Sequence, residues 1–411
     1  MPSSCGPAII TLGCRLNIAE SDAIRGLVGA RDVVVINSCA VTNDAVAATR
    51  RAIRKARRDR PNSELVVTGC AAQIDPASFA AMPEVTRVIG NSDKLNPVAW
   101  GSSEPVIVRT IDRVLDTAPQ LAGGFEGQTR AFVEVQNGCD HACTFCAIPA
   151  GRGPSRSATI DGIVAQVEGM VAAGHAEIVL TGVDLSSYGH DLPDTPKLGD
   201  LVEAIIARTS LRRLRLSSLD PAAIDDKLLE LLTSEPRVMP HVHLSFQAGD
   251  DMVLKRMRRR HSRADAVRLV ERLKGARPEI AIGADLIAGF PTEDDAMAAN
   301  TLALIDDCAI VHAHVFPYSP RARTPAARMP QVPPPIAKAR AQALRDAAAR
   351  RHHDWLSAQI GTITDILVER PGTRGHSPGF ADVRLPPCPP GRIVTARLTQ
   401  LEGDQLIGMP L

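Results

Sequence analysis

From Arg130 onward the sequence repeats one pattern six times: a short apolar run, a polar or glycine-rich phrase, and an amphipathic stretch with helical spacing. The apolar runs are AFVEVQ, EIVLT, RLRLS, HVHLSF, IAIGADLI and IVHAHVF. Strands that alternate with helices predict a parallel sheet covered by helices. The polar phrases stand where a TIM-type barrel carries its chemistry, at the C-terminal ends of its strands. Six units predict a partial (β/α)6 barrel that is open on one side.

Two further regions flank this barrel. Residues 7–90 alternate Val- and Ile-rich runs with helical stretches, which predicts a parallel α/β sheet, and residues 95–128 lack periodicity and are expected to be a linker. After a long basic helix expected over 336–356, short strands and turns predict a small all-β, OB-like barrel. The fold class is therefore α/β. We expect three domains, over residues 1–124, 125–356 and 357–411.

Composition narrows the class of protein. The 411 residues are 45% hydrophobic and 23% charged. They contain neither a long apolar run nor an N-terminal signal segment, so we expect a cytoplasmic protein with no membrane association. Net charge is only +1, and the basic runs at 49–60, 211–215 and 254–263 fit solvated helix faces as well as an anionic partner. Nine cysteines without a secretory signal indicate free thiols or metal ligands.

Three cysteines stand close together in the loop after the first barrel strand, in NGCDHACTFCAIPAGRG: Cys139, Cys143 and Cys146. They could form a buried apolar stripe on a helix, but Gly138 and Pro149 leave little room for one and the neighbours are polar. A zinc site would need a fourth ligand, which His141 could supply. A 4Fe–4S cluster held by three thiolates would keep one iron open for another ligand. The spacing favours the cluster.

Each of three apolar runs near the N-terminus ends in a cysteine: Cys14, Cys39 and Cys70. A single cysteine at a strand end is usually just a small buried residue. Neighbouring parallel strands, however, end at one ligand-binding edge, so three such thiols are expected to converge. The remaining cysteines match no ligand motif and are expected to be non-functional: Cys5, Cys308 and Cys388.

These motifs resemble known families. C-x3-C-x2-C after the first barrel strand, with the aromatic Phe145 before the last cysteine, resembles the signature of radical S-adenosylmethionine (SAM) enzymes. TLGCRLN, INSCAVTN and VTGCAAQ resemble the cluster-binding motifs of methylthiotransferases. LTGVDLSSYG, ADLIAGFPTEDD and HVFPYSPRARTPAARMP are similar to bacterial tRNA methylthiotransferases, nearest to the branch that acts on N6-threonylcarbamoyladenosine beside the anticodon. GHSPGFADVRL resembles that family's RNA-binding TRAM domain.

The resemblance implies a mechanism with two 4Fe–4S clusters and SAM. The cluster on Cys139, Cys143 and Cys146 would bind SAM at its open iron, and reductive cleavage would give a 5′-deoxyadenosyl radical that abstracts hydrogen from carbon 2 of the adenine. The auxiliary cluster on the three N-terminal cysteines would carry a sulfide that a second SAM methylates before transfer. The implied partners are the anticodon stem-loop of tRNA and an electron donor such as a flavodoxin or ferredoxin.

Contacts with SAM and tRNA are implied less specifically. Thr181, Gly182 and Asp184 stand where radical SAM proteins contact the SAM amino group. Ser217 and Ser218 could bond the SAM ribose, although polar residues after a strand often serve as turns or helix caps. Further candidates are Gly289, which would let the adenine approach the backbone, and the arginines expected at tRNA phosphates: Arg152, Arg156, Arg256, Arg258 and Arg259.

Two other functions remain open at this point. Within the enzyme class, the methylthio group could go to isopentenyladenosine in tRNA or to a ribosomal-protein aspartate. In a different class, the chain could be a non-catalytic RNA-binding protein whose cysteines hold zinc as a structural staple.

Overall fold

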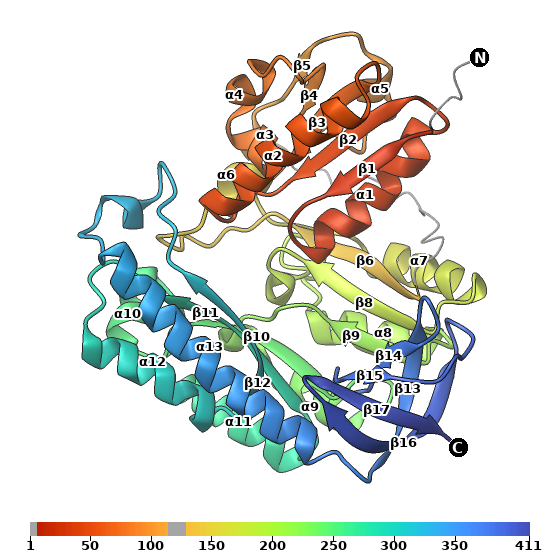
Figure 1. Cartoon of the computed structure of the whole chain (residues 1–411), viewed down its shortest axis with the longest axis vertical. Coiled ribbons are helices and arrows are strands. Elements are labelled where there is room, and N and C mark those ends of the chain that lie inside the picture. Colours follow the sequence, from red (N-terminus) through yellow and green to blue (C-terminus); the bar gives the residue numbers. More distant parts are fainter. Residues whose placement is uncertain (1–5, 114–128) are drawn as a thin grey trace.

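The computed structural model describes residues 6–113 and 129–411. Figure 1 shows the N-terminal sheet at the top, the barrel below it and the C-terminal strands at the lower right. The three expected structural regions are therefore present. The expected boundary at 124/125 lies outside the described residues, and the one at 356/357 falls at the end of the long helix α13 (Pro334–Ser357). The division into domains stays a prediction.

The N-terminal region is a five-stranded parallel sheet in the order β1-β2-β3-β4-β5. Its strands are β1 (Ala8–Thr11), β2 (Val33–Ser38), β3 (Glu64–Gly69), β4 (Arg87–Ile89) and β5 (Val106–Ile107). Its helices are α1 (Arg15–Val28), α2 (Asn43–Asp59), α3 (Cys70–Ile74), α4 (Pro76–Ala80) and α5 (Pro97–Gly101). β2 is buried along its whole length because α1 packs on one face of the sheet and α2 on the other.

The expected linker over 95–128 was partly wrong. α5 and β5 lie inside that range, and β5 completes the sheet by pairing with β4, Val88 opposite Val106. A two-residue strand has too few residues to show a period in sequence, and Trp100 of α5 is buried against the sheet rather than exposed in a linker. A short 3-10 turn, η1 (Ile111–Arg113), follows β5. The rest of the expected linker up to residue 128 lies outside the described residues.

The central region is the expected partial barrel, built from two sheets. One has the order β7-β6-β8-β9 and the other β10-β11-β12, joined only through isolated bridges such as Leu219 with Leu244. The strands are β6 (Arg130–Asn137), β7 (Arg156–Ser157), β8 (Glu177–Gly182), β9 (Arg213–Leu216), β10 (His241–Gln247), β11 (Ala281–Ala288) and β12 (Ile310–Pro317). Among the described strands of this region β7 alone is antiparallel, pairing with β6, and a two-residue strand is too short to show a period in sequence.

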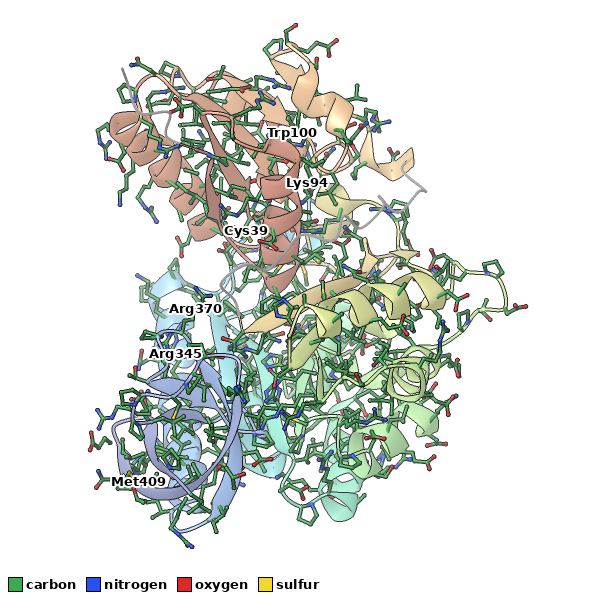
Figure 2. All side chains as sticks on the ribbon, turned by 90° about the vertical axis from the view of Figure 1, so that its right-hand side faces the viewer. Cys39, Lys94, Trp100, Arg345, Arg370 and Met409 are labelled. Carbon is green, nitrogen blue, oxygen red and sulfur yellow. The ribbon has the colours of Figure 1, made fainter. Side chains whose placement is uncertain are left out.

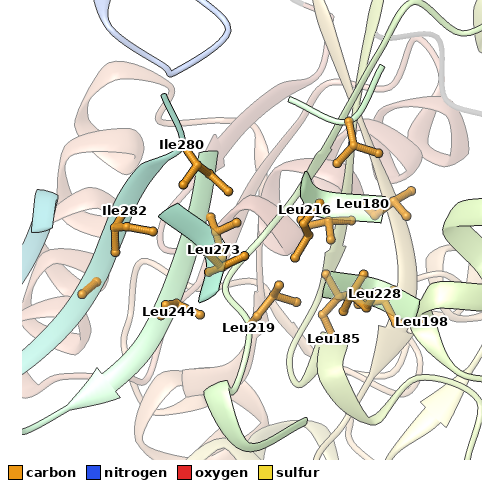
Figure 3. Packing of buried hydrophobic residues seen from close by; sticks show 14 of the residues in the cluster. Leu180, Leu185, Leu198, Leu216, Leu219, Leu228, Leu244, Leu273, Ile280 and Ile282 are labelled. Atoms are coloured by element: carbon orange, nitrogen blue, oxygen red, sulfur yellow. The ribbon is translucent and has the colours of Figure 1, made fainter. Parts of the chain in front are cut away.

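The helices of the central region mostly cover the outside of the barrel. They are α6 (Ile148–Arg152), α7 (Ile160–Ala172), α8 (Leu198–Arg208), α9 (Asp226–Ser234), α10 (Asp251–Met257), α11 (Arg263–Ala276), α12 (Asp295–Asp307) and α13, with 3-10 turns η2 (Leu185–Ser187), η3 (Pro221–Ala223) and η4 (Pro325–Arg328). Of these, α6 lies instead against α3 of the N-terminal region. Figure 3 shows how leucines from strands, such as Leu180 and Leu244, pack against Leu198, Leu228 and Leu273 from the helices. This core fixes the strands whose ends carry the site.

The C-terminal region is a closed five-stranded barrel, as expected, in the order β13-β14-β15-β17-β16. Its strands are β13 (Ile363–Glu369), β14 (Arg374–His376), β15 (Asp382–Arg384), β16 (Ile393–Glu402) and β17 (Gln405–Pro410). A loop of this barrel closes the floor of the central barrel: Arg215 of β9 donates to the carbonyl oxygens of Ser377 and Pro378 at 2.9 and 2.8 Å. Among the described residues, no helix combines the length and hydropathy needed to cross a lipid bilayer.

Candidate active site

The three barrel cysteines occupy the loop between β6 and α6, and backbone groups hold their sulfurs. The loop can turn there because Gly138 has a φ of +75°, and a Cβ at this position would collide with the carbonyl oxygen of Pro154. The amides of His141 and Ile148 donate to the Sγ atoms of Cys139 and Cys146, each at 3.4 Å. N–H groups aimed at sulfur stabilise the thiolate form that a metal requires.

Burial raises the pKa of the Cys139 thiol to about 12 and that of Cys146 to about 11, and repulsion between neighbouring thiolates adds to both shifts. The charge of Arg259, whose Nη1 lies 3.7 Å from the Cys143 Sγ, acts in the opposite direction on the pKa of Cys146. In the metal-free protein, thiols with such pKa values stay protonated, so a metal must displace their protons on binding.

The three N-terminal cysteines converge at the edge of their sheet. Cys14 caps α1, Cys39 follows β2, and Cys70 opens α3 directly after β3. A Cβ added to Gly13 would lie 2.8 Å from the Cβ of Cys39, which shows how closely these strand ends approach. Burial, with smaller contributions from the charges of Cys70 and Cys14, raises the pKa of Cys39 to about 11. Figure 2 shows Cys39 at the lower edge of the N-terminal region, on the side of the barrel.

The two cysteine groups belong to one site. A Cβ on Gly151, in the helix that follows the barrel cysteines, would lie 3.2 Å from the Cβ of Cys70. The amide of Asn91 donates to both the Cys70 Sγ and the Gly151 carbonyl oxygen. The charge of Cys70 also raises the pKa of Cys146. No wall of protein therefore separates the sheet edge from the barrel loop.

A buried ionic network joins the two regions beside the cysteines. Arg152 of α6 contacts Glu20 of α1 at 2.8 Å and the Oδ1 of Asn17 at 2.7 Å, while Lys94 reaches Glu20 at 2.6 Å. Burial alone would raise the pKa of Glu20, but Arg152 and Lys94 outweigh it and hold that pKa at about 2. The expectation that Arg152 binds a tRNA phosphate was wrong, because its side chain is only 2% exposed and already paired.

The other four arginines expected at tRNA phosphates differ in whether their side chains are accessible to a phosphate. Arg156 is buried, and Arg259 is 7% exposed and paired with Asp220 at 3.2 Å, so neither is available to a phosphate on the surface. Arg256 is half-buried and donates to the carbonyl oxygen of Thr292. Only Arg258 is exposed. Basic runs in sequence do not reveal such partners, because the partners come from distant elements.

The polar residues after β8 line the loop beside Cys139. The Asp184 Oδ2 lies 2.8 Å from the Nε2 of His141 and 4.0 Å from the Cys139 Sγ. Burial opposes ionisation of Asp184, but hydrogen bonds from His141 and Ser187 outweigh it and lower its pKa. Thr181 is buried, and Gly182 is needed because a Cβ there would lie 3.0 Å from the side chain of Gln136.

The remaining residues expected to contact SAM differ in setting. Ser217 is buried, and its hydroxyl has no hydrogen-bond partner in the part of the chain that the structure describes, whereas Ser218 is exposed. Phe145 packs edge-on against Phe290, with ring centroids 6.3 Å apart. A glycine stands at position 289 for a different reason from the one expected: its φ is +70°, and a Cβ there would collide with Ala337 of α13. Its proposed adenine contact has no support from this packing.

Sequence reasoning missed a polar cluster inside the barrel. His243 of β10 and His314 of β12 both contact the Oδ1 of Asp285 of β11, at 3.0 and 3.1 Å. A signal was present in HVHLSF and IVHAHVF, where histidines two residues apart must share one face of a strand. Sequence reasoning also did not identify Arg15, which directly follows Cys14, as a candidate site residue.

Comparisons with known proteins identify the family. Residues 7–90 match the model "Uncharacterized protein family UPF0004", and residues 133–305 match the radical SAM superfamily. A threonylcarbamoyladenosine tRNA methylthiotransferase of Rickettsia prowazekii is 46% identical, over 92% of this chain and 90% of its own. The chain belongs to the radical SAM methylthiotransferase family.

Relatives with the same and with a different named substrate also match. The Thermotoga maritima threonylcarbamoyladenosine tRNA methylthiotransferase is 33% identical over 90% of this chain and 88% of its own. A tRNA-2-methylthio-N(6)-dimethylallyladenosine synthase of Cereibacter sphaeroides is 32% identical over 97% of both chains. Among solved structures, the radical SAM methyltransferase TsrM of Kitasatospora setae has a TM-score of 0.53 at 16% identity, over 72% of this chain and 66% of that one, which shows the shared fold.

Family membership settles the class of protein. The chain is a radical SAM methylthiotransferase enzyme, so the non-catalytic zinc-stapled protein considered from the sequence is excluded. The radical SAM match implies a 4Fe–4S cluster and SAM. The barrel loop fits such a group, because it gathers three thiols, backbone N–H groups donate to the sulfurs of Cys139 and Cys146, and the Arg259 guanidinium lies 3.7 Å from the Cys143 Sγ.

Proposed function

We propose that this protein adds a methylthio group to carbon 2 of N6-threonylcarbamoyladenosine next to the anticodon in tRNA. The observation that carries the proposal is the meeting of two cysteine trios at one site, supported by the named activity of a relative that is 46% identical over most of the chain. Sulfur transfer to an unactivated carbon needs a radical source and a sulfur source close together, which two facing cluster sites would provide.

The ligands that we propose are the six cysteines. Cys139, Cys143 and Cys146 would hold the cluster that binds SAM, and Cys14, Cys39 and Cys70 would hold a second 4Fe–4S cluster. When bound, these groups and SAM supply a carbon-centred radical and a sulfur atom for transfer. A flavodoxin or ferredoxin is the proposed electron donor, and a tRNA substrate would place the work in the cytoplasm.

The chain's own residues bind and orient these groups. Arg152, Glu20 and Lys94 lock the sheet edge against the barrel, which keeps the distance between the two cluster sites constant. Asp184 would receive the SAM amino group with help from Thr181 and Gly182, and the unpartnered Ser217 hydroxyl is suited to the SAM ribose. Ser218 and Arg258 are exposed, where tRNA contacts would form.

Mass spectrometry of tRNA nucleosides from a deletion strain tests this function. We expect the 2-methylthio-threonylcarbamoyl nucleoside to disappear, its unthiolated precursor to accumulate, and a plasmid copy of the gene to restore the modification. Persistence of that nucleoside together with loss of the 2-methylthio-isopentenyl nucleoside would move the assignment to the other tRNA substrate. Loss of neither would favour the ribosomal-protein aspartate.

A further inference from the structure

The wall of the barrel formed by β10, β11 and β12 is polar where such walls are usually apolar. Barrel interiors of this type are normally filled with branched apolar side chains. Here the ring of His243 lies 4.6 Å from that of His314, and His241 stands within 5.3 Å of His312. Asp285 lies between the first pair. A polar wall of this kind suits a bound molecule better than a packed core.

The His243–Asp285–His314 group leaves one imidazole exposed on this wall of the barrel. Both rings contact the same oxygen of Asp285, at 3.0 and 3.1 Å, and the two imidazoles hold the pKa of Asp285 well below its usual range despite burial. His314 contacts Asp285 through Nδ1, so a carboxylate bound at Nε2 would require the imidazolium form, in which both ring nitrogens donate. The His314 side chain is 59% exposed, against 6% for His243, so His314 is the accessible member.

Arg15 approaches the same wall from the N-terminal region through Phe380, whose ring lies 5.2 Å from that of His241. Its guanidinium lies 5.9 Å from the centre of the Phe380 ring, which also has Arg130 at 5.1 Å and Arg215 at 5.0 Å. Arg130 and Arg215 are paired with Glu369 and Glu177, at 2.5 and 2.9 Å.

Arg15, by contrast, has neither a hydrogen bond nor an ion pair with any described residue. Glu177 and Asp285 attract it electrostatically, but neither forms an ion pair with it. Its guanidinium, half-buried and without a direct partner among the described residues, has hydrogen-bond donors to offer an anion.

We infer that Arg15 and His314 bind the carboxylate of the threonyl group on the substrate base. This inference rests on the proposed function. A threonyl α-carboxylate is ionised at neutral pH, whereas the dimethylallyl group of the alternative substrate is an uncharged hydrocarbon. Because Arg15 directly follows Cys14, the residue that grips the substituent is fixed to the proposed auxiliary cluster site. The base is thereby selected and oriented by the same contact.

Two other ligands are less well matched to this place. The three ligand atoms of His243, Asp285 and His314 lie within 4.8 Å of one another, a spacing that suits a divalent cation. Arg15 and its two arginine neighbours disfavour a cation there, and Asp285 is already satisfied by the two imidazoles. A tRNA phosphate would stay with the RNA backbone when a base is splayed out toward the barrel, whereas the N6 group enters with the base.

Binding affinity tests the inference without relying on turnover. Anticodon stem-loop RNAs that differ only in the N6 group, carrying threonylcarbamoyl, its methyl ester or dimethylallyl, are titrated by fluorescence anisotropy against the cluster-loaded protein at fixed salt. Wild type should bind the carboxylate RNA about ten- to a hundredfold more tightly than the ester, as expected for charge-assisted hydrogen bonds. Arg15→Gln should reduce that ratio to near one, and Arg15→Lys should keep part of it.

Arg25→Gln is the matched control, because Arg25 lies on the same helix and is exposed. It should leave the carboxylate-to-ester ratio unchanged. His314→Gln should reduce the ratio less than Arg15→Gln, because it removes a ring and leaves the guanidinium.

Several results would overturn the inference. Equal wild-type affinity for carboxylate and ester would do so even if every variant failed to fold. Arg15→Gln weakening all three RNAs equally would assign Arg15 to a backbone phosphate. A stoichiometric zinc or other divalent ion that is lost from His314→Gln would assign the histidines to a metal. If wild type instead prefers the dimethylallyl RNA, the proposed function fails along with the inference. If wild type prefers the carboxylate RNA but a deletion strain keeps its 2-methylthio-threonylcarbamoyl nucleoside, the result contradicts the proposed function and not the binding inference.

Discussion

The two cysteine trios are each proposed to hold a cluster, but the chain brings their sulfurs together in different ways. The barrel trio lies within one loop, so eight residues of sequence bring its sulfurs together. The N-terminal trio comes from three strand ends that are distant in sequence, at positions 14, 39 and 70, and meets only because the sheet is folded. A local trio tolerates disturbance of the rest of the chain, whereas a distributed trio depends on the packing of its sheet. We expect the two sites to respond differently to substitution.

The largest effect should separate the two trios by activity. Cys143→Ala removes a ligand of the proposed SAM-binding cluster, so SAM cleavage should fall to background, a loss of about a thousandfold or more. Cys39→Ala should retain SAM cleavage and abolish methylthio transfer, because the second cluster is the proposed sulfur source. Both are followed by chromatography of 5′-deoxyadenosine and of modified RNA. Cys308→Ala, buried in the barrel core, serves as the control, and retained transfer in Cys39→Ala would remove Cys39 from the proposed ligands.

The ionic network between the trios should give the next largest effect. Glu20→Gln leaves Arg152 and Lys94 buried without a counter-charge, and breaking such a pair costs about 3–5 kcal/mol of unfolding free energy. Asp161→Asn is the control, because the exposed Asp161–Arg208 pair at 2.7 Å should contribute less than about 1 kcal/mol. Urea unfolding of the cluster-free variants measures both. Equal losses would contradict the view that this network locks the two sites together.

Glu134 gives that network a pH dependence of opposite sign to Glu20. Burial and the charge of Glu20 raise the pKa of Glu134 from its ordinary 4.5 to about 7, so the folded state holds a proton that the unfolded state has lost. Wild-type stability should therefore fall as pH rises from 4.5 to 7. Glu134→Gln removes this penalty and should stabilise the protein at pH 8 more than at pH 5. Thermal melts at the two pH values check the sign, and an unchanged difference between variant and wild type would show that Glu134 ionises normally.

The smallest expected effect concerns the barrel site alone. Ser217→Ala removes the buried hydroxyl proposed to bond the SAM ribose, which should raise the KM for SAM by about three- to tenfold with cluster content unchanged. Ser218→Ala, at the exposed neighbouring position, should leave that KM unchanged. Indistinguishable KM values for the two variants would give Ser217 a purely structural role.

The difference between features formed within one short segment and features formed by distant segments also explains what could be predicted from the sequence. The six strands of the barrel and the cysteine spacing are local patterns, and both were predicted. The burial of Arg152 was not, because its partner Glu20 lies 132 residues away, on a helix of another region. The cation at Arg15 was missed for a related reason. Its importance comes from the lack of a direct ion-pair partner among the described residues and from arginines on β6 and β9, which no window of sequence around Cys14 contains.

Iron and acid-labile sulfide on the anaerobically reconstituted protein test the central claim most directly. Two trios that each hold a 4Fe–4S cluster predict about eight irons and eight sulfides in the wild type, and about four of each in both Cys39→Ala and Cys143→Ala. A wild type with only four irons that Cys39→Ala leaves unchanged would contradict the account, because the N-terminal trio would then hold no cluster.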